Sequence, residues 1–170
     1  MKRRRLYHHA VAATFAMTVL AGCTTNDDER IPNMAVSINL SNAGLWNRYG
    51  VSGFGIPQYF IKALKRPAGF AYLDRTMTGY GGVLLIGGFD YTINEVCPLA
   101  YDLSCPVERK ADIRVRIDGD NFEAVCPDCG SKYDVTMGAG APISGEAASH
   151  HYSLRRYKCI PTDQGYLITN

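Results

Sequence analysis

Histidine is scarce in this 170-residue sequence, which contains four histidines in all. His8 and His9 lie near the start of the chain, so only His150 and His151 remain for its main part. Histidine is the side chain most often used as a general base. No Ser-His-Asp arrangement and no pair of carboxylates is singled out by its spacing. The sequence therefore does not favour an independent catalytic activity.

Long hydrophobic runs and an excess of basic charge are also lacking. The apolar stretch from Ala10 to Leu20 is 11 residues long, whereas about 20 residues are needed to span a bilayer. Four of the 18 lysines and arginines stand at positions 2–5, so the chain after position 22 has 14 basic residues against 16 acidic ones. Proteins that bind nucleic acid usually show a basic excess. We therefore expect neither a transmembrane helix nor a nucleic-acid partner.

The first 22 residues have the three parts of a secretory signal, namely a basic start, a short apolar stretch and an end of small residues. They run into Leu20-Ala21-Gly22-Cys23, which resembles the lipobox of bacterial lipoproteins. In that family the cysteine is acylated and becomes the mature N-terminus, and several acyl chains make a lasting anchor. The resemblance implies lipidation of Cys23 and attachment to a membrane. The alternative is an ordinary signal with a chance cysteine.

Residues 23–33 are polar and acidic up to Ile31-Pro32, and we expect them to form a lipidated tether. The acidic run resembles the surface-export signal of lipoproteins from the Bacteroidetes, although a solvated linker explains it equally well. We expect an outer-membrane lipoprotein of the cell envelope, with the periplasmic or surface face left open. The expected organisation is a signal peptide at 1–22, the tether at 23–33 and one domain at 34–170.

Hydrophobic patterning predicts that the domain consists of short strands. Strands are expected at 35–40, 83–86 and 99–102, and hairpins at 113–125 and 154–168. The first hairpin turns at Asp118-Gly119. Residues 58–65 have helical spacing and predict a short helix, while the rest of 41–81 is expected to form loops. The fold class is therefore all-β, a small barrel or sandwich.

The strongest local motif is Cys126-Pro127-Asp128-Cys129-Gly130. A turn of this kind directs two sulfurs to one point and lets backbone amides approach them, as metal-binding knuckles require. Cys105-Pro106 repeats the Cys-Pro opening on the other side of the first predicted hairpin. Two loops at one end of the hairpin can therefore bring three sulfurs together.

The sequence from about Val83 to Ile168, and more loosely from Ile31, resembles the Rieske-type iron–sulfur domain family. The resemblance is carried by the strands at 83–87 and 99–102, the first box at Cys105-Pro106, the second box at 126–134, the covering loop at 141–147 and the strand at 154–157. It implies a small Rieske-like barrel or sandwich with a two-loop metal-knuckle subdomain. It also implies a [2Fe–2S] cluster and one-electron transfer.

The ligand pattern differs from that of the family in both boxes: the first box lacks its histidine, and the second has a cysteine in place of its histidine. A Rieske centre has two cysteines on one iron and two histidines on the other, in the pattern Cys-x-His and Cys-x-x-His. Cys105 and Cys126 fall on the cysteine positions. Val107 stands at the first histidine position and cannot bind a metal, and Cys129 stands at the second. His150 follows the covering loop and is a candidate substitute, or else a surface histidine.

Three hypotheses stay open for the three cysteines. They hold zinc or a single iron, with a fourth ligand from Cys97, Cys159, a histidine or water. Alternatively, two of them form a disulfide in an oxidising compartment, or a [2Fe–2S] cluster persists with an unusual ligand set. Cys97 and Cys159 are themselves a candidate disulfide pair, which would leave three thiols in the two loops.

Two functions follow from these hypotheses. The first is a lipid-anchored envelope protein whose Cys-rich centre serves one-electron transfer or another redox role beside an unknown protein partner. The alternative is a non-redox binding or structural module, in which the cluster is lost and the cysteines form disulfides or bind zinc.

Overall fold

The structure, a computed structural model, describes residues 25–170. The predicted signal peptide and the predicted lipidation of Cys23 lie outside the described residues. Within the described part of the chain, no helix has the length and apolar character needed to cross a membrane.

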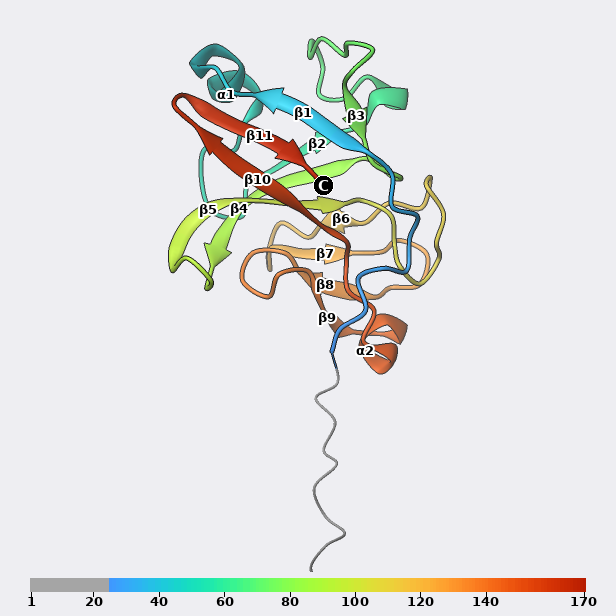
Figure 1. The fold of residues 1–170 in the computed structure, drawn as a ribbon. Coiled ribbons are helices and arrows are strands. Elements are labelled where there is room, and N and C mark those ends of the chain that lie inside the picture. Colours follow the sequence, from blue (N-terminus) through green and yellow to red (C-terminus); the bar gives the residue numbers. More distant parts are fainter. Residues whose placement is uncertain (1–24) are drawn as a thin grey trace, which may run out of the picture.

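Seven antiparallel strands form a nearly closed barrel, seen in the upper half of Figure 1. Their order around the barrel is β2-β4-β5-β10-β11-β1-β3. The strands are β1 (Val36–Leu40), β2 (Pro57–Phe60), β3 (Met77–Thr78), β4 (Val83–Asp90), β5 (Glu95–Asp102), β10 (Arg156–Thr162) and β11 (Gly165–Thr169).

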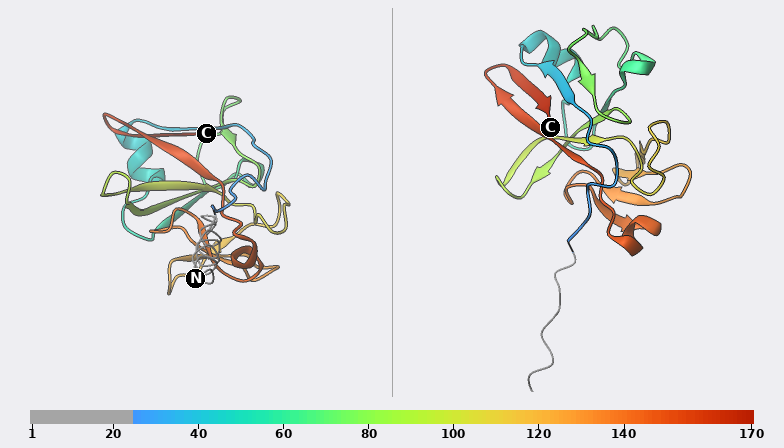
Figure 2. Two further views of the ribbon diagram at one scale, coloured as in Figure 1. Left: turned by 60° about the horizontal axis from the view of Figure 1, so that its bottom comes forward. Right: turned by 45° about the vertical axis from the view of Figure 1, so that its right-hand side comes forward.

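A second sheet of four strands lies against the barrel, in the order β6-β7-β8-β9 (Figures 1 and 2). Its strands are β6 (Arg116–Ile117), β7 (Glu123–Val125), β8 (Lys132–Asp134) and β9 (Ala141–Ser144). The helical segments of the described chain are α1 (Ala43–Tyr49), η1 (Lys62–Leu64) and α2 (Glu146–His150). The prediction of a β fold is thus confirmed, in the form of a barrel plus a small sheet.

Strand β4 is buried on both of its faces, which explains its continuous apolar sequence. Val83 and Leu85 pack into the core inside the barrel, together with residues of β1 and β11. Leu84 and Ile86 pack into the core between the barrel and the small sheet. Side chains of a strand alternate between its faces, so β4 serves both cores.

Most predicted strands are present, often with different ends. The alternation at 35–40 forms β1, whose apolar positions are buried and whose intervening residues are exposed. Both hairpins form, as β6–β7 and β10–β11. The first is shorter than expected because Arg114 leaves the hairpin and pairs with Ser104 instead.

The expected helix at 58–65 is wrong. Pro57–Phe60 forms strand β2 and pairs with β4, and only Lys62–Leu64 makes a single turn of 3₁₀ helix. Pairing with a buried strand outweighed the local helical spacing. The predicted loop region also contains helix α1, which begins where the side chain of Asn42 accepts a hydrogen bond from the N–H of Leu45 at 2.8 Å.

Part of the stretch expected to be a solvated tether is packed on the domain. The N–H of Asp27 donates to the carbonyl of His151 at 2.7 Å, and the N–H of Ser153 donates to the carbonyl of Asp27 at 2.8 Å. Ile31 is buried. The packed structure therefore begins at Asp27, several residues before position 34.

Candidate metal centre

Three cysteines from two loops meet at one end of the small sheet. Cys105 lies in the segment between β5 and β6, and Cys126 and Cys129 lie between β7 and β8. The Sγ atoms of all three lie within 4.8 Å of one another. The sulfurs of Cys105 and Cys129 are 3.6 Å apart. The two loops thus converge as the sequence predicts.

The two loops have the same local geometry. The backbone N–H groups of Asp128 and Cys129 donate to the sulfur of Cys126. In the first loop, the N–H groups of Val107 and Glu108 donate to the sulfur of Cys105. Both loops therefore aim two peptide donors at their first cysteine, as a thiolate needs when it binds a metal.

In each loop, a backbone hydrogen bond joins the first cysteine to the residue four positions later. The N–H of Gly130 donates to the carbonyl of Cys126 at 3.1 Å, and the N–H of Arg109 donates to the carbonyl of Cys105 at 2.8 Å. Gly130 has φ of +68°, in the left-handed region that favours glycine. Arg109, at the equivalent position of the first loop, has φ of +57°, so both turns end in the same left-handed conformation.

Cys105 and Cys126 are fully buried, and Cys129 is partly exposed. Burial raises the pKa of Cys126 to about 12, and it raises the pKa of Cys105 against the opposing effect of the peptide donors. Without a metal, these two thiols therefore keep their protons at neutral pH. A divalent cation supplies the charge that stabilises the thiolates, so its binding releases protons.

Two buried hydroxyl groups support the sulfurs. The Tyr133 hydroxyl lies 3.4 Å from the Cys105 sulfur. The Ser131 hydroxyl lies 3.3 Å from the Cys129 sulfur and accepts a hydrogen bond from the N–H of Ala147 at 3.2 Å. Ala147 belongs to α2, so Ser131 connects the second loop to the segment that covers it.

The sulfur geometry fits a shared metal ion. Two thiolates on one tetrahedral zinc, each about 2.3 Å from the ion, stand about 3.8 Å apart. The Cys105–Cys129 separation of 3.6 Å is close to that value and far from the ~2.05 Å of a disulfide bond. All five described cysteines are free thiols. Three cysteines arranged in this way can hold a metal ion.

Glu108 is a residue that the sequence analysis missed. It stands three residues after Cys105, just as Cys129 stands three residues after Cys126. Comparing Cys-Pro-Val-Glu with Cys-Pro-Asp-Cys would have revealed the match. The Glu108 carboxylate is not among the ligand atoms that lie within 4.8 Å of one another. It is therefore a neighbour of the centre, at the position where a second thiol of the first loop would stand.

The other predicted site residues lie outside the group of three sulfurs. Val107 packs against the core between the barrel and the small sheet. His150 is exposed on α2, and its ring stacks on that of Tyr152 with centroids 5.2 Å apart. His150 is thus placed as a surface histidine beside a tyrosine.

Cys97 and Cys159 are free thiols, so the candidate disulfide between them is not formed in this structure. Cys97 packs against the core between the barrel and the small sheet. Cys159 packs against the core inside the barrel. Each thiol therefore contacts a different core, and the two also line one cavity.

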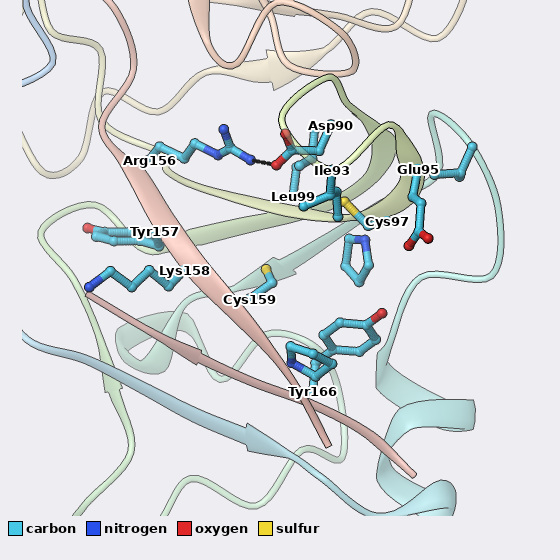
Figure 3. A pocket seen from close by; sticks show the side chains of 13 residues that line it. Asp90, Ile93, Glu95, Cys97, Leu99, Arg156, Tyr157, Lys158, Cys159 and Tyr166 are labelled. Atoms are coloured by element: carbon cyan, nitrogen blue, oxygen red, sulfur yellow. Dashed lines mark hydrogen bonds and ion pairs between the residues drawn. The ribbon is translucent and has the colours of Figure 1, made fainter. Parts of the chain in front are cut away.

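The pairing of β5 with β10 stops short of both cysteines. Strands β5 and β10 pair through Tyr157 and Ala100, and continuing that antiparallel register places Cys159 opposite Pro98 instead of Cys97. Beyond this pairing lies a cavity of about 600 Å³ (Figure 3), whose lining includes both thiols. Cys97 on β5 and Cys159 on β10 thus line this cavity as free thiols.

No protein-family model matches the sequence, and no curated protein matches it either.

Proposed function

We propose that this chain is a lipid-anchored envelope protein whose domain binds one metal ion through Cys105, Cys126 and Cys129. Zinc is the ion that the site fits best, because thiolate ligands in tetrahedral array are typical of zinc. The ion would join the two loops and hold the small sheet in one conformation. The proposed role is that of a binding or structural module at the membrane.

The observation that carries this proposal is the short distance between the sulfurs of Cys105 and Cys129. In a Rieske centre, Cys129 would stand at a histidine position and bind the second iron, whereas Cys105 would bind the first. Ligands of different irons are separated by the length of the cluster. Three sulfurs within 4.8 Å of one another favour a single ion instead.

The arrangement of the two sheets supports a Rieske-like origin for the domain. A barrel carries a small sheet, and two loops of that sheet bring the cysteines together. The departure at Val107 then has a simple consequence. The first loop supplies one ligand, and the fourth position of a tetrahedral ion is left for water or an outside ligand.

A second candidate function is one-electron transfer by a single bound iron. Cys129 favours it, because this sulfur is partly exposed while the other two are buried. Electrons would then enter or leave through the exposed edge of the centre. Lipidation of Cys23 would keep the protein beside a membrane partner in either case.

The test is the content of zinc, iron and acid-labile sulfide per chain, measured on protein purified without added metal. One zinc per chain, without sulfide, is the expected result. One iron without sulfide supports the electron-transfer candidate. Iron with an equal amount of sulfide contradicts the single-ion site and establishes a cluster.

A matched pair of variants shows whether the metal is held by the proposed residues. Cys126→Ser is expected to lose the metal, and Cys159→Ser, which removes a cysteine outside the centre, is expected to keep it. Equal metal content in both variants would refute the proposal. Radiolabelled fatty acid incorporated by cells, and lost in Cys23→Ala, tests the anchor separately.

A further inference from the structure

A polar cavity of about 500 Å³ lies between the N-terminal segment and the domain, and three arginines line it. Arg30 belongs to the docked segment, Arg109 follows the first cysteine loop, and Arg155 precedes β10. Arginine stays charged at every physiological pH. Three positive charges from distant parts of the sequence therefore surround one cavity.

Contacts with the rest of the chain hold each guanidinium group. The Nε of Arg109 donates to the carbonyl of Arg30 at 3.2 Å, and an Nη of Arg155 donates to the carbonyl of Ile31 at 3.0 Å. The guanidinium of Arg30 lies 4.0 Å from the centre of the Tyr152 ring. The three groups are thus positioned before any ligand arrives.

The described protein leaves these charges without a balancing partner. Its ion pairs are Lys132–Glu123 and Arg156–Asp90, and neither involves the cavity. Glu29 is the carboxylate in the lining, so the excess there is two positive charges. The Nε groups of Arg30 and Arg155 are buried and have no hydrogen-bond acceptor among the described residues. Because these two Nε atoms are shielded from water, a ligand in the cavity balances the charge of the guanidinium groups without reaching the Nε atoms themselves.

We propose that this cavity binds a phosphate-type oxyanion. An anion of this kind supplies both the negative charge and several acceptor oxygens, and the planar guanidinium matches it with two parallel hydrogen bonds. The ligand is either a free phosphate or the phosphodiester of a lipid headgroup. Arg30 stands seven residues after Cys23, so the headgroup source is within reach if Cys23 carries the lipid anchor. The anion site itself does not depend on the metal or on the anchor.

The test is thermal unfolding of the purified protein with three sodium salts at equal ionic strength. The salts are chloride, inorganic phosphate and glycerophosphoglycerol, a soluble phosphodiester without acyl chains. A ligand present at 100 times its Kd is expected to raise the Tm by about 5–10 °C. Phosphate acting alone identifies a free oxyanion, and glycerophosphoglycerol acting as well or better identifies a headgroup. If neither raises the Tm beyond chloride, the proposal fails.

Variants locate the effect within the molecule. Arg109→Gln is expected to weaken phosphate binding at least tenfold, whereas Arg75→Gln removes an arginine outside the cavity and keeps it. Arg109→Lys keeps the positive charge but cannot form two parallel hydrogen bonds, so it should give an intermediate affinity for phosphate. The Tm measured without ligand reports whether each variant folds. Cys129→Ser should keep the full phosphate effect, which separates this site from an anion bound to a metal. An unchanged phosphate effect in Arg109→Gln would overturn the assignment.

Discussion

The hydroxyl of Tyr157 donates a 2.6 Å hydrogen bond to the buried carboxylate of Asp102. This bond joins β10 to the last residue of β5. The same carboxylate accepts from the N–H of Tyr80 and of Ser104, each at 2.8 Å, and from the N–H of Gly81 at 3.0 Å. Ser104 directly precedes Cys105, so this network fixes the point at which the first cysteine loop leaves the barrel.

Replacing Tyr157 with phenylalanine should destabilise the domain by about 1.5–3 kcal/mol, because it removes a hydrogen bond to a charged group in a buried site. Urea unfolding measures the change. Tyr166→Phe is the matched control, since it removes a tyrosine hydroxyl while keeping the ring that packs on Trp46. A Tyr157→Phe protein as stable as the control would mean that the network adds nothing to stability.

Ser131→Ala should weaken metal binding by about 10- to 100-fold, the usual effect of losing a group that orients a ligand. The variant removes the hydroxyl beside the Cys129 sulfur and leaves the Ala147 N–H without its acceptor. Competition with a chelator measures the affinity. Ser149→Ala, on the exposed side of α2, should leave it unchanged. Equal affinities in the two variants would contradict a role for Ser131.

Glu108→Cys should complete a four-thiolate site. The first loop then has the same spacing as the second, and its peptide donors already match. We expect the zinc affinity to rise at least tenfold, because structural zinc sites are closed by four protein ligands. Cobalt substitution gives a second readout through the charge-transfer bands of cobalt thiolates, which should strengthen. Unchanged affinity and spectrum would show that the two loops are not equivalent.

Asp134 should make the domain less stable in acid. Burial pushes its pKa upward, but the N–H groups of Met137, Gly138 and Thr136 outweigh that effect, and the net pKa is lowered from 3.8. A carboxyl with a lowered pKa in the folded state stabilises the fold above its unfolded pKa. This contribution is lost as the pH falls through the folded value.

Asp134→Asn removes the charge and tests this pH dependence. At pH 5–7 the variant should be about 1 kcal/mol less stable than the unaltered protein, and the two should converge below the folded pKa. Urea unfolding across the pH range follows the difference. Asp163→Asn, in the exposed turn between β10 and β11, should show no such pH-dependent gap. A constant difference from pH 7 to pH 2 would rule out the charge as the cause.

The sequence predicted the cysteine loops because their signals are local. Cys126-Pro-x-Cys-Gly specifies its own turn, and the hairpin at 113–125 has the length to bring Cys105 to the same end. Helix α1 was missed because Gly44 and Gly50 suggested loops, although Asn42 is a good N-cap.

Features that depend on contacts between distant parts of the chain could not be predicted from the sequence. The surroundings of Cys97 and Cys159 depend on how far β5 and β10 pair, and no local pattern records that extent. The arginine-lined cavity is similar, because Arg30, Arg109 and Arg155 meet only after the N-terminal segment docks on the domain.

Strand β4 forms the common wall of the two cores, and this shared wall has a consequence for how the molecule unfolds. Neither core can open without exposing one face of β4, so both should be lost in a single cooperative transition. The amide hydrogens of Leu84 and Leu85 should then exchange with solvent at the rate set by global unfolding. Because the two cores unfold together, a metal ion bound at the three cysteines would also slow amide hydrogen exchange in barrel strands that do not contact it.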